Sequence, residues 1–193
     1  MAKKSSFTNM VLILTSICII CSAIMGFVYS VTAEPIRLAE VAEIDNAISA
    51  VVPEFDNAPS SEVTSIENDG RISEVYPAKM GGKIVGYAIK TTVSGFGGPM
   101  QIMVGFTYDG TIYNTSVISH SETPGLGNKV ETEKSPFSAQ FKGMDPKITK
   151  MSVKKDGGDI DAITASTISS RAYTKGVDNA CKIFVKIQKQ SQE

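Results

Sequence analysis

The sequence has few of the residues on which metal binding and nucleophilic catalysis depend. Its 193 residues include one histidine, His120, and three cysteines. A single histidine excludes a metal site built from several histidines and argues against a Ser-His-Asp hydrolase. Cys18 and Cys21 lie in an apolar segment, so Cys181 is alone in the rest of the chain and has no partner there for an intrachain disulfide. We therefore expect neither a metal site nor a set of catalytic residues.

The chain also lacks an excess of charge of either sign. Lys and Arg number 19 and Asp and Glu number 20, which gives a net charge of −1. Domains that bind nucleic acid carry a basic surface, so this balance excludes that class. Apolar residues make up 42% and charged residues 20%, a composition that disordered and collagen-like chains do not have. The length suits one domain with a modest additional segment.

Charge is absent above all near the N-terminus. Residues 5–33 carry no charge, and Met10–Val31 is a run of 22 uncharged, mostly apolar residues. A helix of that length covers about 33 Å, enough to span a bilayer core of about 30 Å. Lys3 and Lys4 precede the run, so the positive-inside rule places the N-terminus in the cytoplasm and the remainder outside. A cleaved signal peptide is the alternative, but the run exceeds the roughly 7–15 apolar residues of such a peptide.

The rest of the chain divides into a stalk and a domain. Pro35–Val52 has apolar residues near helical spacing and stops before Pro53, so we expect a helix that continues from the membrane segment. Two of the 19 basic residues precede Glu34, so the last 160 residues carry 17 basic and 20 acidic groups, a net charge of −3. They are numerous enough to bury a core. We assign residues 1–33 to a cytoplasmic N-terminus and transmembrane anchor, 34–55 to a helical stalk and 56–193 to one domain.

The domain begins with strand signals separated by turns. The segments with strand character are 62–67, 71–76, 83–92, 100–107 and 111–119. Turn sequences between them include Asn68-Asp69-Gly70, Gly81-Gly82 and Asp109-Gly110, which favour tight connections between antiparallel strands. The pattern predicts about five antiparallel strands. We expect one more strand over residues 148–153.

Helices are expected after these strands. Ser135-Pro136 is a helix-start sequence and predicts a short helix as far as Phe141. Residues 168–189 predict a long helix, whose middle carries small residues that allow a close approach to a sheet. The stripe on one side of this helix consists of Ile168, Ala172, Gly176, Ala180, Ile183 and Ile187. The order of elements indicates an α+β fold, an antiparallel sheet with helices packed against it.

Two segments carry residues suited to ligand binding. Residues 120–127 read His-Ser-Glu-Thr-Pro-Gly-Leu-Gly. The proline stiffens this loop, the glycines allow close approach to the backbone, and Leu126 offers an apolar surface. Residues 161–170 place four hydroxyl side chains, between positions 164 and 169, at the start of the long helix. Unpaired N–H groups there favour an anion such as phosphate, although ordinary N-capping also explains serine and threonine at this place.

Taken together, the two segments resemble those of the membrane-anchored FMN-binding subunits RnfG and NqrC, from the Rnf and Na⁺-translocating NADH:quinone oxidoreductase complexes. The likeness covers the anchor, the stalk, the sheet, the Glu122–Gly127 loop and the start of the last helix. In that family a phosphoester joins the flavin to a threonine in a motif close to Asp-x-x-Ser-Gly-Ala-Thr-x-Thr-Ser. Asp161 matches the aspartate, Thr164 the serine and Thr167 the modified threonine.

The resemblance implies a set of cofactor-binding residues. Ala165 stands for the family's glycine and Ser166 for its alanine, and both replacements are small. We therefore expect covalent FMN on Thr167. Further contacts are expected from Glu122, Thr123, Gly125, Leu126 and Gly127 in the loop and from Thr164, Ser166 and Ser169 at the helix start. The glycine-rich loop 95–99 is also expected near the flavin, whereas His120 is expected to be a packed or surface residue rather than a proton donor.

The resemblance also implies an electron carrier in a membrane complex. As an RnfG protein, the chain would cross the bacterial cytoplasmic membrane once and hold FMN on the extracytoplasmic side. It would pass electrons between other subunits of a complex that moves electrons from ferredoxin to NAD⁺ and translocates ions, without being catalytic alone. Its partners would be those subunits, lipid and a flavin transferase of the ApbE type that uses FAD and Mg²⁺. The alternatives are an NqrC-type protein, a stand-alone extracytoplasmic flavoprotein and a non-redox binding module on an anchor.

Overall fold

The computed structural model of the chain describes residues 7–68 and 70–190. Lys3, Lys4 and the turn residue Asp69 lie outside these ranges. The helices and strands are α1 (Phe7–Val51), β1 (Thr64–Asn68), β2 (Arg71–Met80), β3 (Lys83–Ser94), β4 (Pro99–Thr107), β5 (Ile112–His120) and α2 (Thr167–Gln190). Short 3₁₀ turns lie between them. The chain forms two compact units, Met1–Ala42 and Glu43–Glu193.

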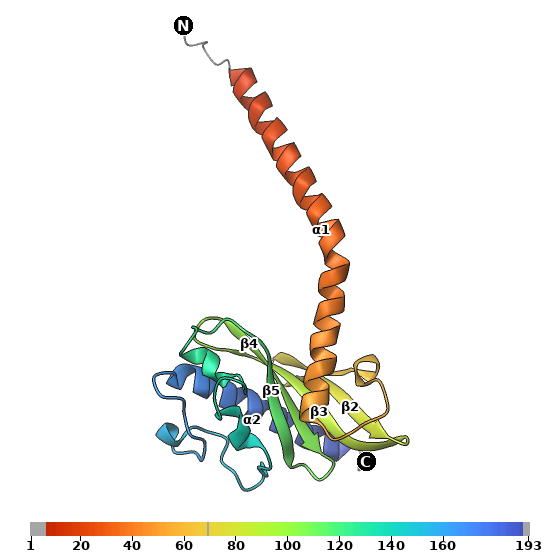
Figure 1. Cartoon of the computed structure of the whole chain (residues 1–193), viewed down its shortest axis with the longest axis vertical. Helices are drawn as coiled ribbons and strands as arrows, with labels where there is room; N and C mark the ends of the chain where they lie inside the picture. The colour runs from red at the N-terminus through yellow and green to blue at the C-terminus, as the bar shows by residue number, and fades with distance from the viewer. Residues whose placement is uncertain (1–6, 69, 191–193) are drawn as a thin grey trace. The chain divides into compact units, whose positions relative to one another are not determined.

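α1 is a single helix of 45 residues that passes through Pro35 (Figure 1). The apolar segment and the residues that follow it as far as Val51 thus form one continuous helix. Every side chain from Phe7 to Thr32 is exposed. In the described part of the chain, α1 is the one helix long and apolar enough to cross a membrane. An exposed apolar surface of this length is suited to lipid rather than to water.

The five strands form an antiparallel sheet in which each strand pairs with its neighbour in the sequence, in the order β1-β2-β3-β4-β5. The predicted number and direction of the strands are confirmed. Tight turns at the expected places produce this meander, because short connections join antiparallel neighbours. The end of β5 and the loop between β3 and β4 lie at the same edge of the sheet, since Met100 pairs with His120.

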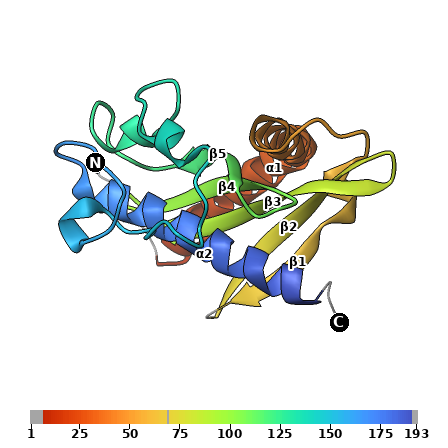
Figure 2. The ribbon, with the colours of Figure 1, turned by 90° about the horizontal axis from the view of Figure 1, so that it is seen from below.

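α2 packs across one face of the sheet (Figure 2). Alternate residues of β3 and β4 point toward it and are buried; they include Ile89, Val93, Ile102, Val104 and Phe106. The small-residue stripe of α2 does allow a close approach. The hydroxyl of Thr91 donates a hydrogen bond of 3.1 Å to the carbonyl of Gly176, and a Cβ at Gly176 would lie 2.8 Å from the end of the Ile102 side chain.

The last turns of α1 cover the opposite face of the sheet. Ala47, Ile48 and Val51 are buried there against a second set of strand residues, which includes Tyr76, Ala88 and Met103. β4 contacts the helix through its backbone, because a Cβ at Gly105 would overlap the carbonyl of Val51. The compact unit consequently begins at Glu43, within α1, and earlier than the start at residue 56 that we assigned from the sequence.

The strand predicted over residues 148–153 is wrong. Val153 makes one isolated bridge, to Ile160, and the rest of the segment consists of turns and irregular backbone. Asp145 explains the difference. Its side chain accepts a hydrogen bond from the N–H of Lys147 at 2.9 Å, and its carbonyl accepts bonds from the next two N–H groups. Such a turn competes with an extended strand for the same backbone groups.

The short helix predicted as far as Phe141 is a single 3₁₀ turn, Ser138–Phe141. The cap predicted at Ser135 is wrong, because the turn begins at Ser138 and its N-cap is Phe137, without a side-chain cap hydrogen bond. The hydroxyl oxygen of Ser135 accepts a hydrogen bond from the N–H of Phe137 at 3.2 Å, and so bends the chain ahead of the turn. The segment on either side of this turn has little regular secondary structure.

Replacing Gly105 with alanine is expected to lower the free energy of unfolding by about 3 kcal/mol, since the new methyl group would overlap a backbone carbonyl. Gly176→Ala is the matched control. Its methyl group would meet side chains rather than backbone, with the flexible end of Ile102 nearest, and alanine gains about 1 kcal/mol of helix propensity, so a smaller loss is expected. Urea denaturation of the full chain in detergent, followed by tyrosine fluorescence, measures both variants. Equal losses in the two variants would contradict the described packing of α1 on β4.

Candidate functional site

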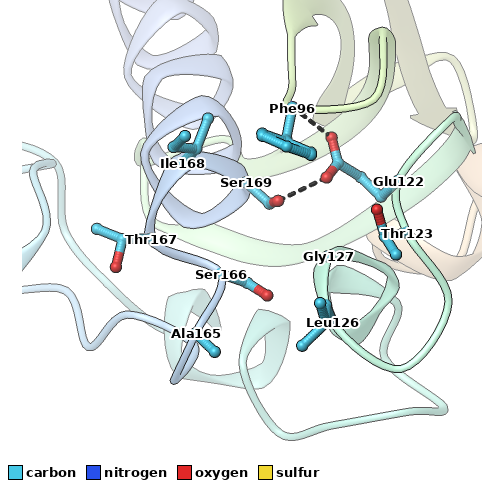
Figure 3. A pocket seen from close by; sticks show the side chains of 10 residues that line it. All are labelled: Phe96, Glu122, Thr123, Leu126, Gly127, Ala165, Ser166, Thr167, Ile168 and Ser169. Atoms are coloured by element: carbon cyan, nitrogen blue, oxygen red, sulfur yellow. Dashed lines mark hydrogen bonds between the residues drawn. The ribbon is translucent and has the colours of Figure 1, made fainter.

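A cavity of about 340 Å³ lies between the start of α2, the β3–β4 loop and the loop after β5 (Figure 3). Its lining residues are Phe96, Glu122, Thr123, Leu126, Gly127, Ala165, Ser166, Thr167, Ile168 and Ser169. Seven of the nine residues expected to contact a cofactor are among them. The two segments that the sequence singled out separately therefore meet in one place.

The buried carboxylate of Glu122 holds the walls of this cavity together. Oε1 accepts hydrogen bonds from the backbone N–H groups of Phe96 at 2.7 Å and Gly97 at 3.4 Å. Oε2 accepts a hydrogen bond of 2.6 Å from the hydroxyl of Ser169. One side chain thus ties the β3–β4 loop and the first turn of α2 to the loop after β5 (Figure 3). The donors replace the water that the carboxylate loses on burial.

The same carboxylate explains two glycines. A Cβ at Gly95 would overlap Oε1 of Glu122, and a Cβ at Gly127 would overlap Oε2. From the sequence we expected Gly127 to make room for a ligand. The structure shows that it first makes room for Glu122, so its requirement for glycine comes from packing within the protein.

His120 positions the loop and does not line the cavity. Its Nδ1 accepts a hydrogen bond of 3.0 Å from the N–H of Glu122. In the neutral ring this places the proton on Nε2, which lies 2.8 Å from Oε1 of Glu131. Lys134 contacts the same carboxylate at 2.8 Å, and hydrogen bonds from Lys134 and then His120 lower the pKa of Glu131. His120 therefore orients the backbone on which Glu122 stands.

Ser166, just before α2, carries a hydroxyl that the protein leaves without a partner. The side chain is 94% buried, and in the described residues its Oγ has no hydrogen-bond partner. It points toward Leu126 and Gly127 (Figure 3). An N-cap serine ordinarily accepts a hydrogen bond from the first turn of its helix, so capping does not explain Ser166. Leaving such a group unpaired costs about 1–3 kcal/mol, which makes the cavity suited to a ligand with polar groups.

Thr167 is the first residue of α2, and its side chain is half-buried. It points away from Glu122, on the other side of the helix start from Ser166 (Figure 3). The ammonium group of Lys155 donates a hydrogen bond of 3.3 Å to its Oγ1. The hydroxyl is therefore accessible, lies where a helix favours negative charge, and has a cation beside it.

Ala165 has a left-handed backbone conformation, with a φ of 63°. This conformation costs an L-residue about 1–2 kcal/mol, whereas glycine adopts it readily. Ala165 is the position at which the family motif has glycine. The backbone at this point thus follows the motif even though the residue departs from it.

Two of the expected contact residues lie outside the cavity. Thr164 lines a separate cavity of about 490 Å³, together with residues that include Phe137 and Gln140. Gly125 turns the loop, with a φ of 77°, and its N–H donates a hydrogen bond to the side chain of Asn128 at 2.8 Å. Phe96 also lines the cavity. We expected its loop, residues 95–99, near the flavin, but did not include Phe96 itself among the contacts. The feature of the sequence that could have indicated this role is a single aromatic residue within a glycine-rich loop.

The residues that line the cavity, and most of the rest of the chain, are similar to known proteins. Residues 95–182 match the family described as FMN-binding domain, a range that contains every residue lining the cavity. The G subunit of the ion-translocating oxidoreductase complex of Shewanella piezotolerans is 31% identical over 193 residues, covering 94% of this chain and 91% of that protein. The G subunit of the Na(+)-translocating ferredoxin:NAD(+) oxidoreductase complex of Acetobacterium woodii is 32% identical and covers 92% and 91%.

A solved structure shares the fold. The crystal structure of the C subunit of Na(+)-translocating NADH-quinone reductase from Parabacteroides distasonis superimposes with a TM-score of 0.51. It covers 77% of this chain and 94% of its own, at 21% sequence identity. The arrangement of sheet and helices is therefore one that a known protein also adopts.

Glu122→Ala is expected to lower the free energy of unfolding by about 3 kcal/mol, because it leaves two backbone N–H groups and the hydroxyl of Ser169 without their acceptor. Glu133→Ala, at an exposed position on the following loop, removes the same charge and is expected to change it by less than about 0.5 kcal/mol. Urea denaturation of both variants measures the difference. A Glu122→Ala variant as stable as the control would show that the carboxylate does not join these segments.

Ala165→Gly is expected to raise the free energy of unfolding by about 0.5–1 kcal/mol, since it relieves a left-handed alanine at the cost of some backbone entropy. Ala139→Gly, at an exposed position of a 3₁₀ turn, serves as the comparison and is expected to lower the free energy of unfolding by a similar amount. Thermal unfolding of the two variants side by side measures both effects. If both lose stability equally, position 165 does not have the left-handed conformation.

Proposed function

The chain belongs to the family of G subunits of ion-translocating oxidoreductase complexes, and we propose that it carries FMN covalently on Thr167 as the electron carrier of such a complex. Two relatives above 30% identity cover nine-tenths of both chains, and the FMN-binding domain match makes it an FMN-carrying protein. The likeness to the C subunit of NADH-quinone reductase is one of fold. Membership of the G-subunit family is therefore favoured over that alternative, over a stand-alone flavoprotein and over a non-redox binding module.

The observation that carries the proposal is the hydroxyl of Thr167 beside a cavity with an unsatisfied polar group. Residues of the cavity fit FMN in their chemistry. Phe96, Leu126 and Ile168 present exposed apolar side chains suited to a flat ring system, whereas Ser166 offers a buried hydroxyl to a polar chain. The start of α2 favours the negative charge of a phosphate.

The chain contributes position and environment, and the cofactor contributes the redox chemistry. When bound, FMN supplies a group that takes up and releases electrons. Thr167 would hold it by a bond to the first residue of a helix that is packed along its length on the sheet. Glu122 keeps the walls at fixed distances, because it binds the β3–β4 loop and the first turn of α2 at once.

We propose that a flavin transferase of the ApbE type attaches the cofactor from FAD with Mg²⁺. A bond would form between Oγ1 of Thr167 and the phosphorus on the flavin side of FAD. The pyrophosphate P–O bond would break, AMP would leave, and the hydroxyl proton would pass to a base. Thr167 is accessible for this step, and its neighbours Ala165 and Ser166 are small.

The chain is a membrane-bound component of its complex, as its family and the exposed apolar surface of α1 indicate. We propose that α1 crosses the bacterial cytoplasmic membrane once, with the N-terminus in the cytoplasm and the flavin domain on the extracytoplasmic side. The two lysines before the apolar run and the absence of charge over residues 5–33 support this orientation. Its partners would be lipid and other subunits of the complex.

When the full chain is co-expressed with a flavin transferase, its intact mass is expected to rise by about 438 Da, the mass of FMN less water. Thr167→Ala is expected to abolish the gain, because it removes the hydroxyl that forms the ester. Thr164→Ala is the matched control, since it removes the same group at a residue that lines another cavity. No gain in the unmodified sequence would disprove covalent attachment, and a loss confined to Thr164→Ala would move the attachment site to Thr164.

A further inference from the structure

Three basic side chains surround the start of α2, and they differ in their partners. Lys154 pairs with Asp161 at 2.8 Å. Arg171 forms two hydrogen bonds with the carboxylate of Asp156, at 2.6 and 2.7 Å, which lower the pKa of Asp156. Lys155, the residue after Lys154, instead donates a hydrogen bond to Oγ1 of Thr167. Within residues 7–68 and 70–190, it forms no ion pair with a carboxylate.

The surrounding contacts hold Lys155 at this hydroxyl. Lys155 is the middle residue of a 3₁₀ turn, Lys154–Asp156, that is fastened on both sides by the ion pairs of its neighbours. Arg171 follows Thr167 by four residues in α2, so the two side chains lie on the same side of the helix. The pair of Arg171 with Asp156 therefore draws the turn toward the side of α2 on which Thr167 lies.

A neutral hydroxyl is a weak partner for an ammonium group, and a phosphate oxygen is a strong one. A phosphoester on Oγ1 of Thr167 would place an anionic oxygen two bonds beyond the atom that Lys155 already contacts. The negative charge on that oxygen would attract the ammonium group directly, whereas the neutral hydroxyl offers it only a dipole. The nearby carboxylates are already bound by Lys154 and Arg171, so Lys155 remains available for a new anion.

We propose that Lys155 is the cation that binds the phosphate joined to Thr167, and that it favours formation of the ester by stabilising the charge on the transferred phosphate. The inference rests on the proposed attachment at Thr167. It adds a residue outside the threonine-containing motif, on a different turn, to the machinery that holds the flavin.

The rate of attachment is the first measurement. The full chain, purified in a maltoside detergent, is incubated with a flavin transferase, FAD and Mg²⁺, and the mass gain is followed over time. Lys155→Gln is expected to slow the gain about tenfold, the effect of losing one charge-assisted hydrogen bond, whereas Lys155→Arg keeps most of the rate. Lys147→Gln is the matched control, because it removes the same charge from an exposed position earlier in the same irregular segment.

The phosphorus resonance of the attached flavin is the second measurement, made on fully modified protein without further transferase. Direct contact predicts that Lys155→Gln shifts this resonance and that Lys147→Gln does not. A slower rate together with an unshifted resonance would overturn the inference, since Lys155 would then contact the transferase. An unchanged rate and resonance would overturn it as well. If the unmodified sequence gains no mass, the attachment itself fails, and the proposed function fails with it.

Discussion

The carboxylate of Glu122 is the interaction on which the cavity depends. A buried carboxylate is stable only when hydrogen-bond donors replace its water, and here they come from the β3–β4 loop and from the first turn of α2. Glu122 itself stands on the loop after β5, oriented by His120. Three segments far apart in the sequence are therefore held at hydrogen-bond distances from one group. The glycines at 95 and 127 follow from the same packing, since neither position has space for a Cβ beside this carboxylate.

The sheet gives this arrangement a rigid base. Helical residues cover both of its faces, and at each face a glycine allows contact at the level of the backbone: Gly105 under the end of α1 and Gly176 within α2. Because α2 is packed along the sheet by buried residues such as Tyr173, Val177 and Ile183, its first turn has little freedom to move. Any group joined to Thr167 consequently inherits a fixed position relative to the protein.

The hydroxyl side chains at the start of α2 serve two purposes. Ser169 and Ser170 are satisfied within the protein, by Glu122 and by the backbone around the helix start, and so stabilise the fold. Ser166 and Thr167 do not have this role. Within the described residues, the hydroxyl of Ser166 is buried without a hydrogen-bond partner, and the hydroxyl of Thr167 has a side-chain hydrogen bond with Lys155 alone. The groups that the fold leaves unused are those that face the cavity and its edge, which is the arrangement expected of a site built for a polar ligand.

Local features of the sequence determined the apolar helix, the five strands and the long last helix, because length, turn residues and the spacing of apolar residues act over a few positions. The motif around Thr167 could be recognised from the sequence for the same reason, because its residues lie within ten positions of one another. Local reasoning failed at residues 148–153, where the side chain of Asp145 starts a turn, and it did not separate Thr164 from the cavity. The roles of Phe96 and Glu122 required the tertiary structure. They depend on hydrogen bonds between residues 26 and 47 positions apart, and such contacts exist only once the sheet and α2 have brought the segments together.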